Sequence, residues 1–402
     1  MNTQRVSIGD LAEQVRGVTY KKEDASRTPK SGYLPVLRAG NITDDGLTFA
    51  DLVFIPAVRI TDEQMIRRND VVIATSSGSL EVVGKAATAL ENFEGGFGAF
   101  CKVLRPGDRL HPAYFSHFFK THEYRRRVSA LASGVSINNL RNEHLNKIEL
   151  PLPPLLEQRR IAEILDQAEV LRAKRREVLA QLNEMIKSIF FDMFSGSRAD
   201  GWTLTTVAGV ARADQGAIRT GPFGSQLLHS EFVDNGIAVL GIDNVVTNEF
   251  RWADRRFVTE TKYRELNRYT VRPGDVLITI MGTCGRCAVA PDDIPLTINT
   301  KHLCCITLDR AKCLPVFLHA YFLRHPVARR YLNQTAKGAI MSGLNMGIIK
   351  AMPLLLPPLA LQQEFADLVE AVERLKISHR AHLAELDALF ASLQYRAFRG
   401  EL

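Results

Sequence analysis

Two long stretches of the chain carry apolar residues at the spacing of a helix that packs against another helix. In residues 156–194 and 361–399 the apolar side chains recur alternately three and four positions apart, which is typical of a coiled-coil seam. Each helix would be about 58 Å long at roughly 1.5 Å per residue, too long for one face of a small domain. We therefore predict that the helices pack along each other; the alternative is two separate amphipathic helices, each on its own domain. The predicted seam consists of Ile161, Ile164, Leu171, Leu182, Ile189, Phe365, Leu368, Leu375, Leu386 and Leu393.

Each predicted helix follows a proline-rich segment, and the two segments are copies of each other. Pro153-Pro154-Leu155 matches Pro357-Pro358-Leu359 at an offset of 204 residues, and the register holds without a gap for over forty residues. Upstream, VLRAGNI (36–42) resembles VLGIDNV (239–245), and NDVVIA (69–74) resembles GDVLIT (274–279). A repeat of such long period decides architecture before local propensity does. The chain is therefore predicted to be a tandem duplication of a globular block followed by a helix.

The duplication predicts an α+β fold, with two α/β blocks joined by two long antiparallel coiled-coil helices and related by an approximate two-fold axis. If the first helix leads away from the first block, the second can bury its seam only by running back. Proline is expected just before each helix, and Gly196 and Gly400 stand where a left-handed C-cap is wanted. The predicted segments are residues 1–150, 151–200, 201–355 and 356–402.

Composition and charge narrow the class of protein. With 402 residues, 46% of them hydrophobic and 24% charged, the chain can fill two or three cores. It has no run of eighteen apolar residues, and its start lacks the pattern of a secretory signal, so we expect a cytoplasmic protein without membrane contact. The net charge is +3 in residues 1–150 and +6 in residues 201–355, but 0 and −2 in the two helical segments. A basic excess confined to the blocks permits a polyanionic partner there.

Candidate catalytic and metal motifs are weak. GSLEVVGKA (78–86) has one residue too many for a phosphate-binding loop. Asp254 with Glu260 and Lys262 leaves open a nuclease cluster, although such loose spacing is common in charge-rich stretches. The pair Cys284 and Cys287, with Cys304-Cys305, suggests zinc, but adjacent cysteines on a strand point to opposite faces. We expect buried, reduced thiols and no metal.

Two related basic blocks with two-fold symmetry match a duplex DNA site with separated halves. In addition, GDVLIT (274–279), PLPPLLEQRRIAEIL (151–165) and GPFGSQL (221–227), in this order and duplication, resemble the specificity subunit of type I restriction and modification enzymes. The likeness covers essentially the whole chain. It implies that residues 1–150 and 201–355 are target recognition domains, that residues 151–200 and 356–402 are conserved helical regions, the first a spacer, and that the chain reads a bipartite DNA sequence without an active site of its own.

The resemblance also implies partners. Two modification subunits, which bind S-adenosylmethionine and methylate adenine N6, would dock on the helices, and up to two restriction subunits, which use ATP and Mg²⁺, would join them. No cofactor is expected on this chain. Three alternatives remain: a specificity subunit of a methyltransferase that lacks the type I nuclease, a coiled-coil scaffold without DNA binding, and an autonomous nuclease.

Candidate DNA contacts are polar residues on loops, because their donors and acceptors reach base edges, and clustered arginines, which neutralise phosphates. The arginines are equally compatible with a solvated helix face. The candidates are Lys21, Lys22, Lys30, Ser76, Ser77, Ser79, Arg125, Arg126, Arg127, Arg219, Ser225, Gln226, Thr300, Lys301, Arg329 and Arg330.

Overall fold

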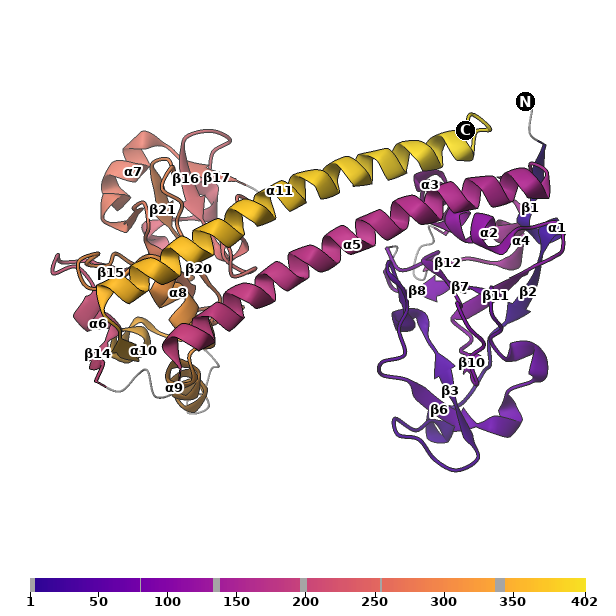
Figure 1. The fold of residues 1–402 in the computed structure, drawn as a ribbon, viewed down its shortest axis with the longest axis horizontal. Helices are drawn as coiled ribbons and strands as arrows, with labels where there is room; N and C mark the ends of the chain where they lie inside the picture. Colours follow the sequence, from indigo (N-terminus) through magenta and orange to yellow (C-terminus); the bar gives the residue numbers. More distant parts are fainter. Residues whose placement is uncertain (1–3, 80, 133–137, 196–200, 254, 337–343) are drawn as a thin grey trace. The chain divides into compact units, whose positions relative to one another are not determined.

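The computed structural model describes residues 4–79, 81–132, 138–195, 201–253, 255–336 and 344–402. The chain forms two compact units: unit 1 consists of Met1–Glu177 and Arg380–Leu402, and unit 2 of Val178–His379. Two long helices, α5 (Leu155–Phe194) and α11 (Leu359–Ala397), each contribute one half to either unit (Figure 1). Both helices lie within two residues of their predicted bounds. The division into four segments stays a prediction, because the units combine blocks with helix halves.

The globular block of unit 1 is a set of small sheets with helices on one side. Its strands are β1 (Arg5–Ser7), β2 (Ala12–Arg16), β3 (Tyr33–Leu37), β4 (Ile42–Thr43), β5 (Gly46–Leu47), β6 (Val53–Pro56), β7 (Val71–Ala74), β8 (Ser76–Ser77), β9 (Ala86–Thr88), β10 (Gly96–Phe97), β11 (Cys101–Pro106), β12 (Asn138–Asn139) and β13 (Glu149–Pro151). Its helices are α1 (Ile8–Leu11), α2 (Pro112–Phe119), α3 (His122–Ala132) and α4 (Asn142–Asn146). The main sheets have the orders β2-β11-β7-β9 and β10-β3-β6.

The block of unit 2 repeats this plan. Its strands are β14 (Thr203–Thr206), β15 (Ile218–Thr220), β16 (Ile237–Leu240), β17 (Arg256–Val258), β18 (Thr270–Val271), β19 (Val276–Thr279), β20 (Cys287–Val289), β21 (Thr297–Asn299), β22 (Leu303–Ile306) and β23 (Pro353–Leu356). Its helices are α6 (Val207–Val210), α7 (Glu260–Leu266), α8 (Pro315–Arg324), α9 (Pro326–Ala336) and α10 (Met346–Ala351). The sheets β15-β22-β19-β20 and β17-β16-β21-β18 correspond to those of unit 1.

The repeated motifs occupy equivalent strands in the two blocks. VVIA of β7 and VLIT of β19 are the buried strands of the four-stranded sheets, with every residue buried. In both units a parallel pair, β10 with β3 and β21 with β16, belongs to the other sheet. The first strand of each block pairs antiparallel with the strand before the long helix, β1 with β13 and β14 with β23. The predicted fold class and duplication are therefore confirmed.

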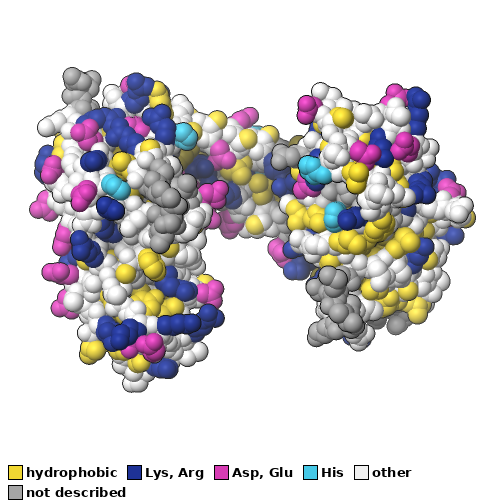
Figure 2. Space-filling model, turned by 180° about the vertical axis from the view of Figure 1, so that it is seen from behind, with side chains coloured by type: hydrophobic (Ala, Val, Ile, Leu, Met, Phe, Trp, Pro, Cys, Tyr) yellow, Lys and Arg dark blue, Asp and Glu magenta, His cyan; other side chains and the backbone are white. Residues whose placement is uncertain are grey.

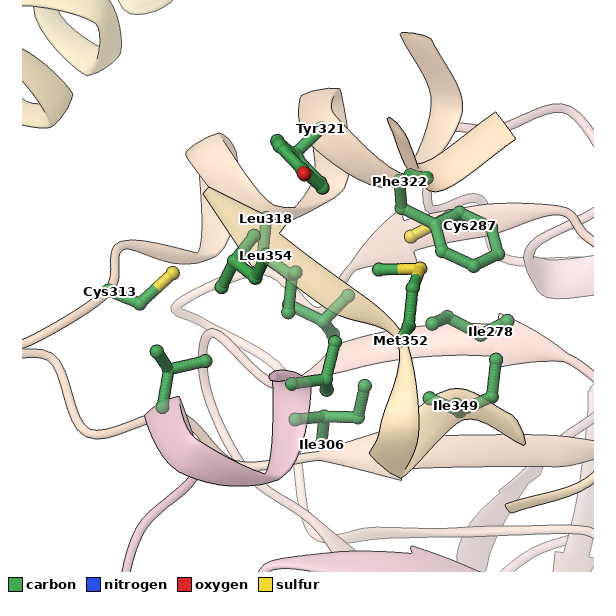
Figure 3. Packing of buried hydrophobic residues seen from close by; sticks show 14 of the residues in the cluster. Ile278, Cys287, Ile306, Cys313, Leu318, Tyr321, Phe322, Ile349, Met352 and Leu354 are labelled. Atoms are coloured by element: carbon green, nitrogen blue, oxygen red, sulfur yellow. The ribbon is translucent and has the colours of Figure 1, made fainter. Parts of the chain in front are cut away.

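The core of unit 2 lies between its four-stranded sheet and its helices. Ile278 and Met352 lie beside Phe322 in this layer (Figure 3), and Ile306 belongs to the same cluster. The adjacent residues Cys304 and Cys305 lie in two different hydrophobic clusters, because neighbouring side chains on a strand point to opposite faces. Burial raises the pKa of the Cys304 thiol to about 12. Five of the six cysteines are buried, as expected, and Cys284 is half-buried.

One buried glutamine side chain joins each proline motif to its block. Gln158, 1% exposed, accepts a hydrogen bond from the His111 backbone N–H (2.8 Å) and donates to the Arg109 (3.0 Å) and Pro153 (2.9 Å) carbonyls. A primary amide carries two donors and one acceptor group in a plane, so one side chain connects the loop before α2, the proline segment and the helix.

Gln362 makes the same three contacts in unit 2. It is fully buried, accepts from the Leu314 N–H (2.9 Å) and donates to the Lys312 (3.1 Å) and Pro357 (2.9 Å) carbonyls. The two glutamines are 204 residues apart. We call these two residues the glutamine clamps. They explain why the proline motif occurs twice, since each block needs its own attachment to its helix.

The two helices run antiparallel. In unit 1, Ile161 and Leu165 near the start of α5 share a cluster with Phe390 near the end of α11. In unit 2, Leu182 and Ile186 near the end of α5 pack on Val372 of α11. The left-handed cap predicted at the end of the second helix is present, because Gly400 has a φ of 74°. Gly196 lies outside the described residues.

The predicted seam needs a correction. Leu171 is 53% exposed, Leu368 is 40% exposed and Leu375 is 53% exposed, so these three residues do not belong to the buried face. Ile161, Leu182 and Phe365 are buried, and Ile164, Ile189, Leu386 and Leu393 are half-buried.

The buried face of each helix, here called the buried stripe, is rotated relative to the predicted seam, because each helix packs against both its block and the other long helix. In place of the exposed leucines, residues four positions after the first heptad position are buried, such as Leu165, Ile186 and Phe390. Leu165 shares its cluster with Tyr114 and Phe118 of the block as well as with α11. A helix that packs only on another helix buries two positions per heptad. Here a third position per heptad is buried as well, because it packs against the block.

Equivalent basic residues lie in this rotated stripe. Lys376, 2% exposed on its side chain, pairs with Glu373 (2.6 Å) and Glu249 (3.1 Å). Arg172 pairs with Glu169 (2.5 Å) and with Asp387 of α11 (2.6 Å). Lys376 and Arg172 are 204 residues apart, as are their helical partners. A buried charge is tolerated only with its partners in place, so these pairs restrict how the helices can slide.

We predict that Gln362→Glu destabilises unit 2 by roughly 1–3 kcal/mol at pH 7, because an ionised carboxylate would face the Lys312 and Pro357 carbonyls without a donor. The protonated acid can still donate, so the folded-state pKa of the new group is raised. The loss should therefore grow as pH rises above about 4.3, where an unfolded glutamate ionises. Urea unfolding at pH 4.5 and pH 7 measures it. The exposed Gln167, changed to Glu, is the control; an equal loss in both variants would contradict the clamp.

Candidate nucleic-acid interface

In each block, two of the predicted DNA-reading loops are brought against one turn. A Cβ atom on Gly17 would lie 2.1 Å from the Gly98 carbonyl oxygen, and one on Gly221 would lie 2.0 Å from that of Asn299. Only glycine permits this approach. The loop after β2, which carries Lys21 to Lys30, therefore starts against the turn at residues 98–100.

The second loop of unit 1 meets the same turn. The Phe100 carbonyl accepts from the N–H groups of Thr75 (2.8 Å) and Ser76 (3.3 Å), which places the segment with Ser76, Ser77 and Ser79 beside it. In unit 2, the Gly221 contact places the start of the loop that carries Ser225 and Gln226 against Thr300. The structure thus brings predicted loops together in pairs, at equivalent places of the two blocks.

Most predicted contacts are accessible. Lys21, Lys22, Lys30, Ser79, Arg126, Ser225, Gln226, Arg329 and Arg330 are exposed, and Ser76, Ser77, Arg125, Arg127, Thr300 and Lys301 are half-buried. On the face drawn in Figure 2, Lys and Arg side chains lie among Asp and Glu side chains over both blocks. On this face the basic charge is therefore spread over each block and does not form one uniform patch.

Arg219 is an exception, and its assignment as a DNA contact is corrected. It is 8% exposed and forms a buried ion pair with Asp275 (2.6 Å), and it donates to the Thr307 hydroxyl (2.9 Å). Asp275 is the second residue of the GDVLIT motif. Its counterpart Asp70, equally buried, pairs with Arg105 (2.9 Å). Arg219 balances a buried charge inside the sheet, so it cannot reach DNA.

The arginine cluster 125–127 is also partly structural. Arg125 donates to the carbonyls of Val83 (3.0 Å) and Glu81 (2.9 Å), and so holds a loop onto α3. Arg127 pairs with Glu123 (2.7 Å) one helical turn earlier. Arg126 is exposed on the same helix. Of the three, Arg126 is the one best placed to meet a phosphate.

Two ring-bearing residues at the turns are candidates that the sequence did not reveal. Phe100 is 68% exposed on a turn whose carbonyl is fixed by two hydrogen bonds. At the equivalent turn of unit 2, the His302 carbonyl accepts from the Ile280 N–H (2.9 Å). Burial, and to a lesser extent the positive charges of Lys301 and Arg256, lower the pKa of His302 and so favour its neutral imidazole. Phe100 has no polar side chain that would mark it in the sequence as a DNA contact, although an aromatic ring can contact a thymine methyl or a base step.

The nuclease and metal alternatives gain no support. Asp254 lies outside the described residues, and Lys262 is paired with Glu231 (2.8 Å) and Glu265 (3.0 Å) on or beside α7. Within the described ranges, no group of three or more His, Cys, Asp and Glu side chains could hold a metal ion. None of the described helices is long and apolar enough to cross a bilayer.

Sequence comparison identifies the class to which this architecture belongs. The family model described as "Type I restriction modification DNA specificity domain" matches residues 2–183 and 230–388. The chain belongs to this family. It is 32% identical to the Type I restriction enzyme EcoKI specificity subunit of Escherichia coli strain K12, over 98% of this chain and 88% of that protein. It is also 32% identical to the StySPI specificity subunit of Salmonella potsdam, with the same coverage.

Solved structures have the same fold. A chain from work on complex assembly and conformational transition of the type I R-M system superposes with a TM-score of 0.58 at 18% identity, covering 100% of this chain and 98% of that one. The type I S subunit of M. genitalium superposes with a TM-score of 0.56 at 15% identity, covering 99% and 96%. The resemblance inferred from the motifs is therefore confirmed.

We predict that Arg219→Ala destabilises unit 2 by roughly 3–5 kcal/mol, because it leaves the Asp275 carboxylate buried without its cation. The sequence preference for DNA of the remaining folded protein should not change. Ser225→Ala, an exposed position on the same loop, is the control and should leave stability within about 0.5 kcal/mol. Chemical unfolding and competition with altered DNA targets provide the two measurements. A stable Arg219→Ala protein with altered base preference would restore Arg219 as a reader.

Proposed function

We propose that this specificity subunit reads a bipartite duplex DNA target, with the block of each unit contacting one half-site. The observation that carries the proposal is the repeated pair of loops, anchored by Gly17 in one block and Gly221 in the other. Equivalent loops with different side chains are suited to read two different short sequences. The basic excess of both blocks, +3 and +6, favours a nucleic-acid partner.

Within each block, the contacts divide into two kinds. Exposed lysines and arginines such as Lys21 and Arg126 would neutralise phosphates and set the affinity. Side chains at the turns, such as Ser76 and Phe100 in unit 1 or Thr300 and His302 in unit 2, would meet base edges. Specificity subunits of this family recognise DNA for partner enzymes and are not enzymes themselves.

The partner surface in this proposal is the exposed side of the helices. Leu171, Leu368 and Leu375, left out of the buried stripe, are joined by Met185 (48% exposed) and Leu389 (50% exposed). Such recurring exposed apolar residues mark an interface. We assign it to two modification subunits, which would bring S-adenosylmethionine. Up to two restriction subunits would bring ATP and Mg²⁺ to the assembly.

Two other assignments remain to be distinguished. A methyltransferase that lacks the nuclease would use the same chain, and the presence or absence of restriction subunits beside it separates the two. A coiled-coil scaffold would not bind DNA. Retention on duplex DNA with steep salt dependence excludes the scaffold.

We predict that exchanging residues 1–150 for the matching block of a relative changes one half of the methylated target and leaves the other half as it was. The reason is that each block has its own core and its own glutamine clamp. Sequencing of methylated adenines in host DNA reads both halves directly, and exchanging residues 201–355 is the reciprocal control. A simultaneous change in both halves would refute the two-reader arrangement.

We predict that Arg126→Ala combined with Arg330→Ala weakens binding to all DNA sequences alike and reduces the slope of log affinity against log salt by up to about two. Both residues are exposed and would release counterions on phosphate contact. Filter binding or anisotropy at several salt concentrations measures the slope. Arg264→Ala is the control, because its side chain is exposed and paired with Glu260. An unchanged slope would assign the two arginines to a merely solvated surface.

A further inference from the structure

A cleft of about 490 Å³ in unit 2 lies between the two long helices and the block. Its apolar wall includes Phe365 and Val369 of α11 and Leu323 of α8, and its rim carries several charged side chains. The cleft is separate from the turns at Gly221 and Thr300, because neither those loops nor β15 line it. Of the predicted DNA contacts, Arg329 alone is among the residues that line it, so the DNA-reading role described above does not account for the cleft.

The acidic residues of the cleft are already paired. Glu373 and Glu249 both bind Lys376, at 2.6 and 3.1 Å, and Glu249 also pairs with Arg251 (3.2 Å). These interactions neutralise the lysine within the wall.

Three arginines of the cleft are without such a partner. In the part of the chain that the structure describes, no carboxylate forms an ion pair with Arg286, Arg324 or Arg329. Arg324 is the most informative, because its Nη1 is buried and has no hydrogen-bond partner among the described residues. Burial lowers the pKa of Arg324, and the neighbouring Glu184, which partly offsets this, forms its own ion pair with Lys187 (3.1 Å).

A buried donor without a partner is costly to the isolated protein, and native structures contain few of them. A planar guanidinium with a free N–H is suited to an oxygen anion such as a carboxylate. We infer that this cleft receives an acidic side chain of a protein partner, which binds Arg324 while apolar neighbours of that side chain cover Phe365 and Val369.

A protein carboxylate fits this site better than a DNA phosphate does. Duplex phosphates form a continuous convex row and meet protruding side chains, whereas Nη1 of Arg324 is recessed beside an apolar wall. The exposed leucines Leu368 and Leu375 are on the same helix as Val369. The cleft therefore lies on a helix that also carries part of the apolar surface assigned to the modification subunits. The inference rests on that proposed function and adds the chemistry of the partner.

A cleft at the corresponding part of the block of unit 1 is lined by Asp44, Asp45, Glu91 and Lys120, and by no residue of α5 or α11. Ser116, which lines it, is 203 residues before His319, which lines the cleft of unit 2. The arginines are thus not required by the duplicated fold. This supports a role in binding and argues against a general structural one.

The test uses Arg324→Met, which keeps most of the side-chain volume and removes the charge. We expect the full-length variant to bind the modification subunit of the same system at least about 10-fold more weakly in calorimetry, whereas its affinity and salt slope for duplex DNA stay unchanged. Its melting temperature should equal or exceed that of the unaltered chain, because the unpaired buried donor is gone. A purely structural arginine would give the reverse, with a lower melting temperature and full partner binding.

Controls separate this inference from the proposed function. Arg264→Met, at an exposed position of α7, should bind the modification subunit as the unaltered chain does. If Arg324→Met also bound it normally, the cleft assignment would fail and the proposed function would stand. If the unaltered chain bound DNA but no modification subunit, the cleft assignment and the partner assignment would both fail, whereas the DNA-reading role would stand. Stabilisation of the unaltered chain by inorganic phosphate, lost in Arg324→Met, would show a site for free anions and overturn the protein partner.

Discussion

Each block is attached to its long helix through one buried glutamine amide, and the rest of the structure depends on this attachment. Gln158 and Gln362 each form hydrogen bonds with three backbone groups. Two of these groups lie in the loop before α2 or α8, and the third lies in the proline segment. Backbone groups that are buried need partners, and no rotation of the helix preserves all three bonds. The amide thus fixes both the direction and the rotation of the helix as it leaves the block.

The attachment also determines which face of the helix is buried. Its buried stripe must cover the block on one side and the antiparallel helix on the other, so it includes Leu165 and Phe390 and leaves Leu171 and Leu375 exposed. The pairs around Arg172 and Lys376 lie in that stripe and resist sliding. The exposed leucines are a consequence of the attachment, and they form the surface that we assign to partner subunits.

The residues that would contact DNA differ between the two units, whereas the attachment of block to helix is the same in both. The sheets and clamps are alike in both units, whereas the residues on the equivalent turns differ, with Phe100 in one and His302 in the other. Glycines at positions 17 and 221 let the loops touch the turn without a side chain between them. A constant frame with interchangeable loop residues allows each unit to acquire its own half-site without changes to the core.

The sequence by itself determined the duplication, the two long helices, the buried strands and the family, because repeats and apolar periodicity are properties of neighbours along the chain. It also located the proline motifs and the Gly400 cap. Only the tertiary structure decided which face of each helix is buried, since that depends on a block more than forty residues away. It likewise showed that Arg219 serves Asp275, 56 residues later, and that Nη1 of Arg324 has no hydrogen-bond partner among the described residues. A loop arginine that reads DNA and one that balances a buried charge look the same in sequence, because the difference lies in the carboxylate that the fold brings to it.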